Sequence, residues 1–379
     1  MRVTLVTHYF PGHRGGVELV AWEIASRLAR ARFADIVWHA SATDEPPDDE
    51  PGLQFEPARA CNAIEDRLGV PFPVWSPAAL LRVARAARTA EVVHIHDFFY
   101  LPNLVAWATA RLSGRRVVVT QHIGSIAYRN PALRMALAAA NRLLGRLVLG
   151  SATQTVFVSR PVLEYFSRFV RFRRPPLFVP NGVDGQMFRF ADEAQRRALR
   201  ARLGQEAERP LILFVGRFVE KKGLAILRTL AASVPAARWI FVGRGPMDPA
   251  GWGLENVSVR GSLSRKELVP LYQAADLLVL PSFGEGFPLV VQEAMACGTP
   301  ALVSDDTAAA YPEAAGILLS EPLGPGDPAA RWSERIRRLI SAPAALRALR
   351  EQVARFARDN WSWERCVARY AEVLRSCGS

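Results

Sequence analysis

The sequence predicts an α/β protein made of two doubly wound, Rossmann-like domains that face each other across a cleft. Along the chain, short runs rich in Val, Ile and Leu alternate with longer segments rich in Ala, Leu and Arg. This alternation is typical of parallel sheets whose faces are both covered by helices. The chain has 379 residues, half of them hydrophobic. This length favours two domains, since a domain commonly holds about 150 residues.

The expected strands form two sets of six, one in each half of the chain. The first set is RVTLVTH (2–8), ADIVWHA (34–40), EVVHIHD (91–97), RVVVTQH (116–122), QTVFVS (154–159) and PLFVPN (176–181). The second set is LILFVGR (211–217), RWIFVGR (238–244), NVSVRG (256–261), DLLVLPS (276–282), PALVS (300–304) and GILLS (316–320). The segment ATDEPPDDEPG (42–52) is expected to be a solvated acidic loop.

The domain boundary is expected near VPNGVDGQMF (179–188), where Pro, Asn and Gly interrupt the periodic pattern. Residues 1–180 and 181–360 are therefore assigned to the two domains. The last segment, WSWERCVARYAEVLRS (361–376), is amphipathic and starts with aromatic residues. We expect a packed helix there, within a segment 361–379 that returns toward the N-terminal domain.

The composition argues against membrane-spanning, secreted and zinc-binding proteins. No run of about 18 apolar residues is free of Arg, Pro or Gly, and the first residues, MRVTLVTHYF, lack the apolar core of a signal peptide. The four cysteines are far apart, without a disulfide or zinc spacing. We therefore expect a soluble, cytoplasmic protein.

The positive charge is concentrated in one segment. The formal net charge is +12, and residues 98–180 hold twelve arginines against one acid, Glu164. Such a field attracts anionic membranes, nucleic acids or phosphorylated substrates. Compositional bias is an alternative explanation, since the whole chain has forty-five arginines and three lysines.

One part of this segment favours a membrane as the partner. The stretch PALRMALAAANRLLGRLVLG (131–150) is amphipathic, which is typical of peripheral association with an anionic membrane, here the inner face of the cytoplasmic membrane. No nucleic acid is expected, because stacking aromatic residues on a recognisable module are lacking.

The loop after the first expected strand contains a pair of glycines. Gly15 and Gly16 directly precede a helix that is expected from about Val17. Sheets of this kind bind ligands beyond the carboxyl ends of their strands, and free amides at a helix start attract phosphate. Glycine pairs also occur because turns need positive φ. The spacing is not that of a dinucleotide fingerprint.

The loop after the first strand of the second domain contains two cations. Arg217 follows the strand, and Lys222 lies five residues later, just before Gly223. A guanidinium and an ammonium group together suit a diphosphate. The alternative is a solvated turn in which a cation pairs with Glu220.

Two glutamates frame the segment EGFPLVVQE. Glu285 lies in an expected loop, and Glu293 lies inside a helix that is expected to have Pro288 at its first position. The free amides of Leu289 and Val290 would point toward the ligand edge of the sheet. Glu293 is an acid in an otherwise apolar helix and needs a polar partner, which ribose hydroxyls would provide.

Taken together, these motifs resemble those of GT-B glycosyltransferases, and closely those of the retaining family 4 enzymes. The resemblance covers nearly the whole chain. It rests on GGVE (15–18), NGVD (181–184), GRFVEKKG (216–223), VGRGP (242–246), AADLLVLPSFGEGFPLVVQEAMACGTP (274–300) and WSWERCVARYAEVL (361–374). It implies an acceptor-side N-terminal domain and a C-terminal domain that binds a nucleotide diphosphate sugar.

The resemblance implies roles for the residues of the second domain. Arg217 and Lys222 would bind the donor diphosphate, and Glu293 would bind the ribose. Glu285 would contact the transferred sugar near the reacting centre.

It also implies roles for residues elsewhere. Gly16 would approach the diphosphate from the opposite domain, and His122 in VVTQH would face the sugar and the acceptor. Arg260, Gly261 and Leu263 would border the nucleobase.

The chain departs from the family pattern at several positions. Arg244 replaces a usual Asp in VGRGP, and Pro288 replaces a common glycine. The glycine-rich acceptor-side turn becomes DDTAAAYPEAA (305–315), so the shape of the sugar pocket does not follow from the resemblance. His94 and His96 have a spacing that suits a metal ion, but a third ligand is lacking, so hydrogen bonds at the strand end are favoured over a metal site.

The sequence therefore predicts a retaining, metal-independent glycosyltransferase that uses no cofactor and moves a sugar from a nucleotide diphosphate sugar to an acceptor hydroxyl. The expected catalytic residues are Glu285, His122, Arg217 and Lys222. The expected acceptor is a lipid-linked or cell-envelope glycan. A GT-B epimerase or phosphorylase, and a non-catalytic protein that binds a nucleotide sugar, are the alternatives.

Overall fold

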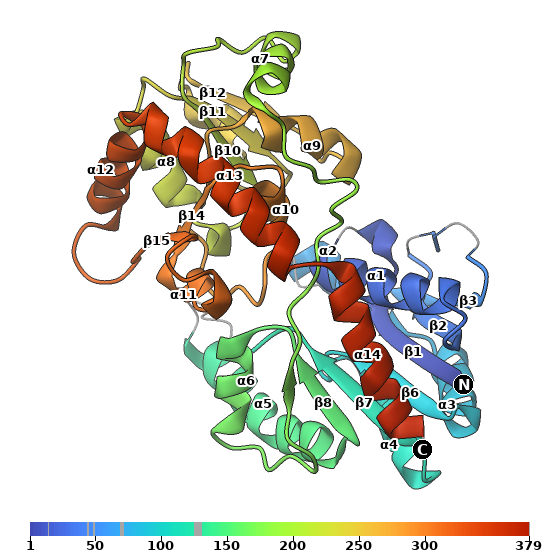
Figure 1. Cartoon of the computed structure of the whole chain (residues 1–379). Coiled ribbons are helices and arrows are strands. Elements are labelled where there is room, and N and C mark those ends of the chain that lie inside the picture. The colour runs from blue at the N-terminus through green and yellow to red at the C-terminus, as the bar shows by residue number, and fades with distance from the viewer. Residues whose placement is uncertain (14, 44, 48–49, 69–71, 125–130, 379) are drawn as a thin grey trace. The chain divides into compact units, whose positions relative to one another are not determined.

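The computed structural model describes residues 1–13, 15–43, 45–47, 50–68, 72–124 and 131–378. The chain forms two compact units (Figure 1). The N-terminal unit contains Met1–Asn181 together with Trp363–Ser379, and the C-terminal unit contains Gly182–Ser362. The last helix of the chain therefore belongs to the N-terminal unit.

The N-terminal unit contains a parallel sheet of seven strands in the order β3-β2-β1-β6-β7-β8-β9. The strands are β1 (Arg2–Tyr9), β2 (Asp35–Ser41), β3 (Leu53–Ala58), β6 (Val92–His96), β7 (Arg116–Gln121), β8 (Gln154–Phe157) and β9 (Leu177–Phe178). The chain order reverses between β1 and β6. The loops after these two strands therefore lie at the switch point where such sheets bind ligands.

All six strands expected in this half are present, and β3 is an additional strand that the sequence analysis did not predict. It follows the acidic loop, and its residues Glu56 and Pro57 obscure the apolar pattern. β3 lies at the edge of the sheet and pairs with β2 only. An edge strand tolerates proline because no further strand needs its amide.

Helices cover both faces of the N-terminal sheet. They are α1 (Gly16–Arg30), α2 (Ala63–Leu68), α3 (Pro77–Thr89), α4 (Leu101–Leu112), α5 (Pro131–Ser151), α6 (Arg160–Ser167) and α14 (Trp363–Gly378). A separate two-stranded antiparallel sheet is formed by β4 (Ala60–Cys61) and β5 (Val74–Trp75), with α2 between them along the chain. Helix α14 packs against α1, β6 and β7.

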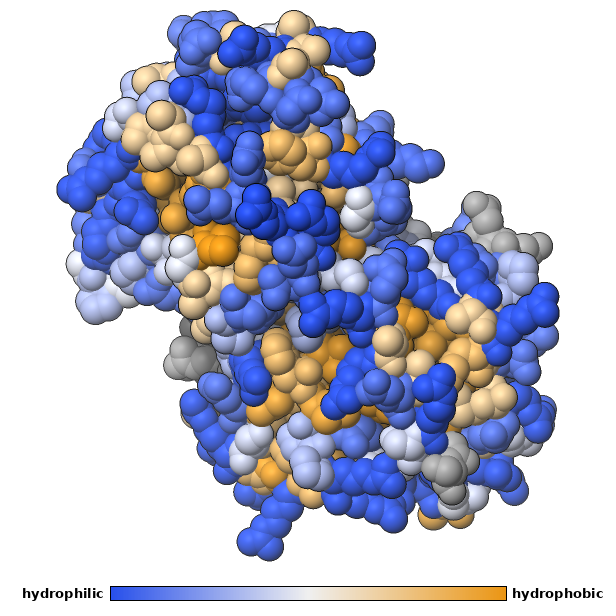
Figure 2. All heavy atoms as spheres, viewed as in Figure 1, coloured by the Kyte–Doolittle hydropathy of each residue, from blue (hydrophilic) through white to orange (hydrophobic). Residues whose placement is uncertain are grey.

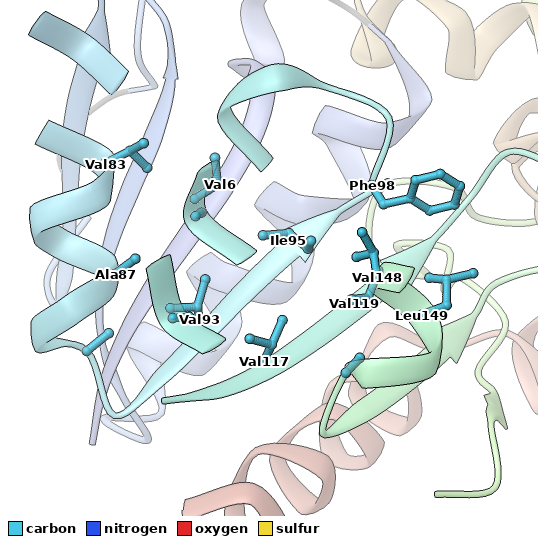
Figure 3. Close-up of a cluster of buried hydrophobic side chains, with 14 of the residues drawn as sticks. Val6, Val83, Ala87, Val93, Ile95, Phe98, Val117, Val119, Val148 and Leu149 are labelled. Carbon is cyan, nitrogen blue, oxygen red and sulfur yellow. The ribbon is translucent and has the colours of Figure 1, made fainter. Parts of the chain in front are cut away.

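Alternate residues of the central strands contact helices on opposite faces of this sheet. On one face, strand valines and Ile95 pack with Val83 of α3 and Val148 of α5 in a buried core (Figure 3). On the other face, Thr120 of β7 donates a hydrogen bond of 3.2 Å to the hydroxyl of Tyr370 in α14.

The C-terminal unit contains a parallel sheet of six strands in the order β12-β11-β10-β13-β14-β15. The strands are β10 (Leu211–Val215), β11 (Arg238–Val242), β12 (Val257–Arg260), β13 (Leu277–Leu280), β14 (Ala301–Ser304) and β15 (Leu319–Glu321). All six were predicted from the sequence. The switch point lies between β10 and β13.

The helices of the C-terminal unit alternate with its strands. They are α7 (Glu193–Arg202), α8 (Leu224–Ser233), α9 (Arg265–Ala274), α10 (Leu289–Ala296), α11 (Asp305–Ala308), α12 (Pro328–Ile340) and α13 (Pro343–Asn360). Both sheets thus have the doubly wound α/β topology that the alternating pattern predicts, and the predicted fold class is confirmed.

Polar side chains cover much of the visible surface. Hydrophilic residues dominate the face shown in Figure 2, with apolar patches between them. In the described part of the chain, no helix has both the length and the apolar character needed to cross a membrane.

Candidate active site

Two loops meet at the switch point of the C-terminal sheet. Lys222 follows β10, and Glu285 follows β13. The Nζ of Lys222 and the Oε1 of Glu285 form an ion pair of 2.8 Å, with 13% and 10% of the two side chains exposed. The sequence analysis placed both residues at this edge but did not anticipate that they pair with each other.

Gly223 permits the close approach of these loops. Its φ is +74°, and a Cβ atom there would lie 2.2 Å from the carbonyl oxygen of Pro281. The amide of Phe283 also donates a hydrogen bond of 3.0 Å to the carbonyl of Lys221. A residue with a side chain at position 223 would therefore meet the neighbouring loop and also strain its own backbone.

The cations of the first loop keep Glu285 ionised. Burial alone would raise the pKa of Glu285, but the charges of Lys222, Lys221 and Arg217 outweigh burial and hold this pKa below its ordinary value. Burial lowers the pKa of Lys221, and the charges of Lys222 and Arg217 lower it further. The Arg217 side chain is exposed. The site thus gathers a carboxylate and several cations, which suits a substrate that combines a sugar with a diphosphate.

Helix α10 begins one residue later than predicted. Pro288 is its N-cap rather than its first helical residue, and the helix starts at Leu289. The hydroxyl of Tyr311 donates a hydrogen bond of 2.6 Å to the carbonyl of Pro288 and holds this end in place. The amides of Leu289 and Val290 lie in the first turn, where a helix offers no intrahelical acceptor.

Glu293 has protein partners within the C-terminal unit. It is 4% exposed, and it accepts hydrogen bonds of 3.1 Å from the Nε of Arg265 and 3.1 Å from the hydroxyl of Tyr272. Ribose hydroxyls are therefore not needed to satisfy this buried acid, contrary to the argument made from the sequence. Its contact with a ribose stays a prediction. The sequence did not identify Arg265 and Tyr272 as partners of Glu293, because the packing of α9 against α10 brings them together.

The altered turn 305–315 supports the loop of Glu285. The carboxylate of Asp306 accepts a hydrogen bond of 2.8 Å from the amide of Gly284. The ring of Tyr311 lies 4.2 Å from the ring of Phe287, measured between centroids. Residues of this turn thus contact the loop of Glu285 at two places.

The segment expected at the nucleobase lies at the same edge of the sheet. Arg260 ends β12, and Gly261 is exposed while Leu263 is half-buried. A Cβ atom on Gly261 would lie 3.5 Å from the Nε of Arg244. Arg244, noted in the sequence only as a departure, therefore lies beside the predicted base position.

The N-terminal unit holds His122 in a buried polar cluster at the end of β7. The Nδ1 of His96 and the Nε2 of His122 are 2.9 Å apart. Asp97 Oδ1 accepts hydrogen bonds from the amides of His122 (2.9 Å) and Ile123 (3.2 Å). The φ of Asp97 is +57°, and Asn103 donates to its carbonyl. The strand-end hydrogen bonds that were favoured over a metal site are therefore present.

Burial determines the protonation of this cluster. It lowers the pKa of His122 to about 3 and that of His94 to about 3. It raises the pKa of Asp97 to about 6, although the amides of His122 and Ile123 oppose this shift. His122 is thus neutral at pH 7 and can offer a substrate a hydrogen bond but no charge.

A second buried pair lies at the start of α1. The Nε2 of His8 and the Oε1 of Glu18 are 2.8 Å apart, and the His8 ring stacks on Tyr100 with a centroid distance of 4.0 Å. The sequence analysis quoted Glu18 in GGVE but gave neither residue a role. The sequence did contain a signal for this pair, because His8 lies at the end of a strand and the acid Glu18 lies in the helix that follows.

The two glycines of this loop are explained differently. A Cβ atom on Gly15 would lie 2.1 Å from the Oε2 of Glu18, so a side chain there would push the Glu18 carboxylate out of its present position. A Cβ atom on Gly16 would meet nothing within 4 Å. The helix begins at Gly16, one residue earlier than expected. Close approach of a diphosphate to Gly16 stays a prediction.

The cysteines and histidines form no metal site in the residues that the structure describes, where no group of three or more His, Cys, Asp or Glu could hold a metal ion. Cys61 is exposed, whereas the other three cysteines are buried. His94 Nε2 lies 2.8 Å from Thr120 Oγ1.

Comparison with known proteins agrees with this architecture. Residues 14–186 match the model of glycosyltransferase family 4, and residues 209–342 match the model of glycosyl transferases group 1. The chain is 29% identical to a D-inositol 3-phosphate glycosyltransferase of Segniliparus rotundus, over 96% of this chain and 86% of that protein.

Solved structures share the fold over almost the whole chain. Sucrose-phosphate synthase from Thermosynechococcus elongatus superposes with a TM-score of 0.80 at 20% identity and covers 99% of this chain and 98% of its own. Anabaena HepE in complex with UDP and glucose has a TM-score of 0.77 at 18% identity and covers 99% of this chain and 100% of its own. With a family 4 domain followed by a group 1 domain on two doubly wound sheets, the chain belongs to the GT-B glycosyltransferases.

Proposed function

We propose that the chain transfers a sugar from a nucleotide diphosphate sugar to an acceptor hydroxyl with retention of anomeric configuration and without a metal ion. The observation that carries the proposal is the 2.8 Å ion pair between Lys222 and Glu285 at the switch point. Under this proposal, the ammonium group of Lys222 would bind the diphosphate and the neighbouring carboxylate of Glu285 would face the sugar, at the edge of the sheet where ligands bind.

The charges of the site suit the departure of the diphosphate. When the bond between the anomeric carbon and the phosphate oxygen breaks, the diphosphate gains negative charge and the sugar becomes positive. Arg217, Lys222 and the first-turn amides of α10 would stabilise the diphosphate, and Glu285 would stabilise the sugar. These cations would supply the charge that a metal ion supplies in other transferases.

Retention is proposed by analogy with the family. The acceptor would attack from the face that the diphosphate leaves, within an ion pair, and the leaving phosphate would take the proton of the acceptor hydroxyl. Glu285 would then act as an electrostatic partner and not as a covalent nucleophile. His122, neutral at pH 7, would donate a hydrogen bond to the sugar or acceptor.

Two acceptor classes deserve testing. The inositol phosphate named for the relative from Segniliparus rotundus is one. A lipid-linked or cell-envelope glycan is the other, favoured by the twelve arginines of residues 98–180. Because the Anabaena structure contains UDP, UDP-sugars are the first donors to test.

The test is an assay of radiolabelled nucleotide sugars with both acceptor classes, followed by NMR of the anomeric proton of the product. We expect transfer to one acceptor class, an unchanged anomeric configuration and full activity with excess chelator. Inversion would refute retention, and loss of activity that Mg²⁺ or Mn²⁺ restores would refute metal independence.

The same assay separates the alternatives. An epimerase would change the nucleotide sugar without an acceptor, and a phosphorylase would need phosphate. A non-catalytic binding protein would show a thermal shift with the nucleotide but no labelled product. A ligand at about 100 times its Kd raises stability by about 2.7 kcal/mol, which thermal shift detects.

A further inference from the structure

Helix α5 carries an exposed apolar stripe, although its other face is already packed in the core. Met135, Leu143 and Leu147 are 68%, 72% and 51% exposed. Their spacings of eight and four residues place them on one side of the helix, together with the exposed Ala139. Val148 and Leu149, on the opposite side, are completely buried in the core of the N-terminal unit (Figure 3).

Arginines lie next to this stripe. Arg142 and Arg146 are exposed on α5. Arg146 donates a hydrogen bond of 3.1 Å to the carbonyl of Phe169, so the segment after α6 lies beside α5, as Figure 1 shows for the two helices. That segment adds the exposed Arg168 and Arg171. The sequence of α5 contains no Asp or Glu.

We propose that this stripe and its arginines, which we call the α5 face, dock on an anionic lipid bilayer. The helix would lie in the plane of the interface, with the leucines and Met135 among the acyl chains and the arginines at the lipid phosphates. This inference rests on the proposed function: docking on a bilayer would bring the enzyme to a lipid-linked acceptor, which lies at a membrane.

The composition of the α5 face favours lipid over other partners. Cores of protein interfaces are enriched in aromatic side chains, Met and Arg, and Leu is under-represented among their hot spots. The α5 face shares Met135 and the arginines with such interfaces, but its other large exposed apolar residues are leucines and none is aromatic. Single-stranded nucleic acids need aromatic side chains for base stacking. A bilayer needs only an apolar stripe with cations beside it.

Sedimentation with vesicles tests the proposal on the full chain. The probes are phosphatidylcholine vesicles with and without phosphatidylglycerol. We expect at least about fivefold stronger binding to the anionic vesicles, with a decline as salt rises from about 0.05 M to about 0.5 M. Equal binding to both vesicle types, or no binding to either, would overturn the proposal.

Substitutions locate the surface. Leu143→Ser combined with Leu147→Ser should weaken binding to anionic vesicles at least about tenfold, and Arg142→Gln should weaken it about fivefold. Leu81→Ser and Arg85→Gln are matched controls on α3, where both residues are also exposed. The controls should bind like the unaltered chain. If they weaken binding as much as the α5 variants do, the α5 face is not the docking surface.

Failure of this proposal can be told from failure of the proposed function. Vesicle binding needs no turnover, so it can be measured even if no transfer is found. Conversely, transfer to a water-soluble acceptor should be unchanged in the leucine double variant. A double variant that binds vesicles normally refutes docking through α5 and leaves the proposed transfer untouched.

Discussion

Glu285 and Glu293 have different partners, and this difference separates their expected roles. Glu285, in a loop, pairs with the ammonium group of Lys222. Glu293 is fixed within α10 by Arg265 and Tyr272. If Lys222 binds the diphosphate as proposed, Glu285 loses this partner to the substrate and its carboxylate can respond to bond breaking. Glu293, held by two donors, would provide a fixed contact.

Replacing each glutamate tests this division. Glu285→Gln should lower kcat at least about tenfold, which is about 1.4 kcal/mol, because the developing charge on the sugar loses its partner. Its nucleotide affinity should be unchanged or slightly higher, because Lys222 is released from Glu285. Glu293→Gln should weaken binding of the nucleoside diphosphate by about 1–3 kcal/mol. Calorimetry with the free nucleotide and turnover at saturating donor measure the two effects.

Thermal unfolding is the control for this pair, because Glu293→Gln also removes the negative charge that pairs with Arg265. Affinities should therefore be compared at temperatures where both variants are folded. Equal loss of nucleotide affinity in the two variants, or normal turnover of Glu285→Gln, would contradict the division of roles.

Asp306 provides a second prediction at this scale. Its carboxylate holds the amide of Gly284, next to Glu285. Asp306→Ala should lower kcat by about fivefold, or about 1 kcal/mol, with little change in nucleotide affinity, because the lost hydrogen bond loosens only the loop. Asp305→Ala is the matched control, since Asp305 is an adjacent exposed acid on the same helix. If both alanine variants have the same kcat, Asp306 does not position the loop.

The elements of the sheets were largely predictable, because a buried parallel strand must be a run of apolar, often β-branched residues. Such runs as LILFV (211–215) and LLVL (277–280) have few other interpretations. The edge strand β3 is half exposed and contains proline, so its pattern resembles a loop. Helix starts were predicted within one residue at Gly16 and Leu289, where local signals are strong.

Contacts between elements were not predictable in the same way. Lys222 and Glu285 were each assigned to the ligand edge because each lies in a loop after an expected strand, and in the sheet these two strands, β10 and β13, are neighbours. Their pairing, and the partners of Glu293 on α9, depend on side-chain packing across loops and helices. A single sequence contains no local signal for such contacts.

The loop between β10 and α8 allows a test of close packing. Gly223→Ala should lower the stability of the C-terminal unit by about 2 kcal/mol or more, because it adds a steric clash with Pro281 to the strain of a positive φ. Gly204→Ala is the matched control. Gly204 also has a positive φ, +67°, but a Cβ there would meet nothing within 4 Å.

Urea unfolding of the two variants measures the difference. The control should show the backbone strain alone, about 1 kcal/mol. Equal destabilisation of both variants would mean that the neighbouring loop moves aside at little cost. Close packing at Gly223 would then not be needed to hold the loops of Lys222 and Glu285 in place.

At the scale of the whole molecule, the buried histidines predict a loss of stability in mild acid. Burial lowers the pKa of His39 to about 4 and those of His94 and His122 to about 3, against an ordinary value of 6.5. The folded state therefore binds fewer protons than the unfolded state below about pH 6.5. The contribution of these histidines to the free energy of unfolding is fully present above that pH. It falls as the pH drops, by about 1.4 kcal/mol per pH unit for each histidine.

Asp97 acts in the opposite direction over part of this range. Its raised pKa, about 6 against 3.8, makes the folded state less stable as the pH rises from about 4 to 6. One acid offsets about one of the histidines, so the net loss in acid remains. Calorimetric unfolding between pH 8 and pH 5 should show the transition of the N-terminal unit moving down. The C-terminal unit contains none of the six histidines and serves as an internal reference.

His39→Leu should reduce this slope by about 1.4 kcal/mol per pH unit. The replacement is tolerable because His39 is 4% exposed and its Nε2 has no hydrogen-bond partner among the described residues. An unchanged slope would show that His39 does not contribute to the pH dependence.

The placement of α14 in the N-terminal unit has a consequence for biosynthesis. The C-terminal unit is a continuous stretch, Gly182–Ser362, whereas the N-terminal unit needs both ends of the chain. On the ribosome, β6, β7 and α1 stay without this cover while the second unit is translated, because the helix that packs on them emerges only after that unit. A chain that ends before Trp363 would contain every residue of the second unit but would lack the helix that covers β6 and β7 of the first, and such an incomplete unit exposes apolar surface that favours aggregation.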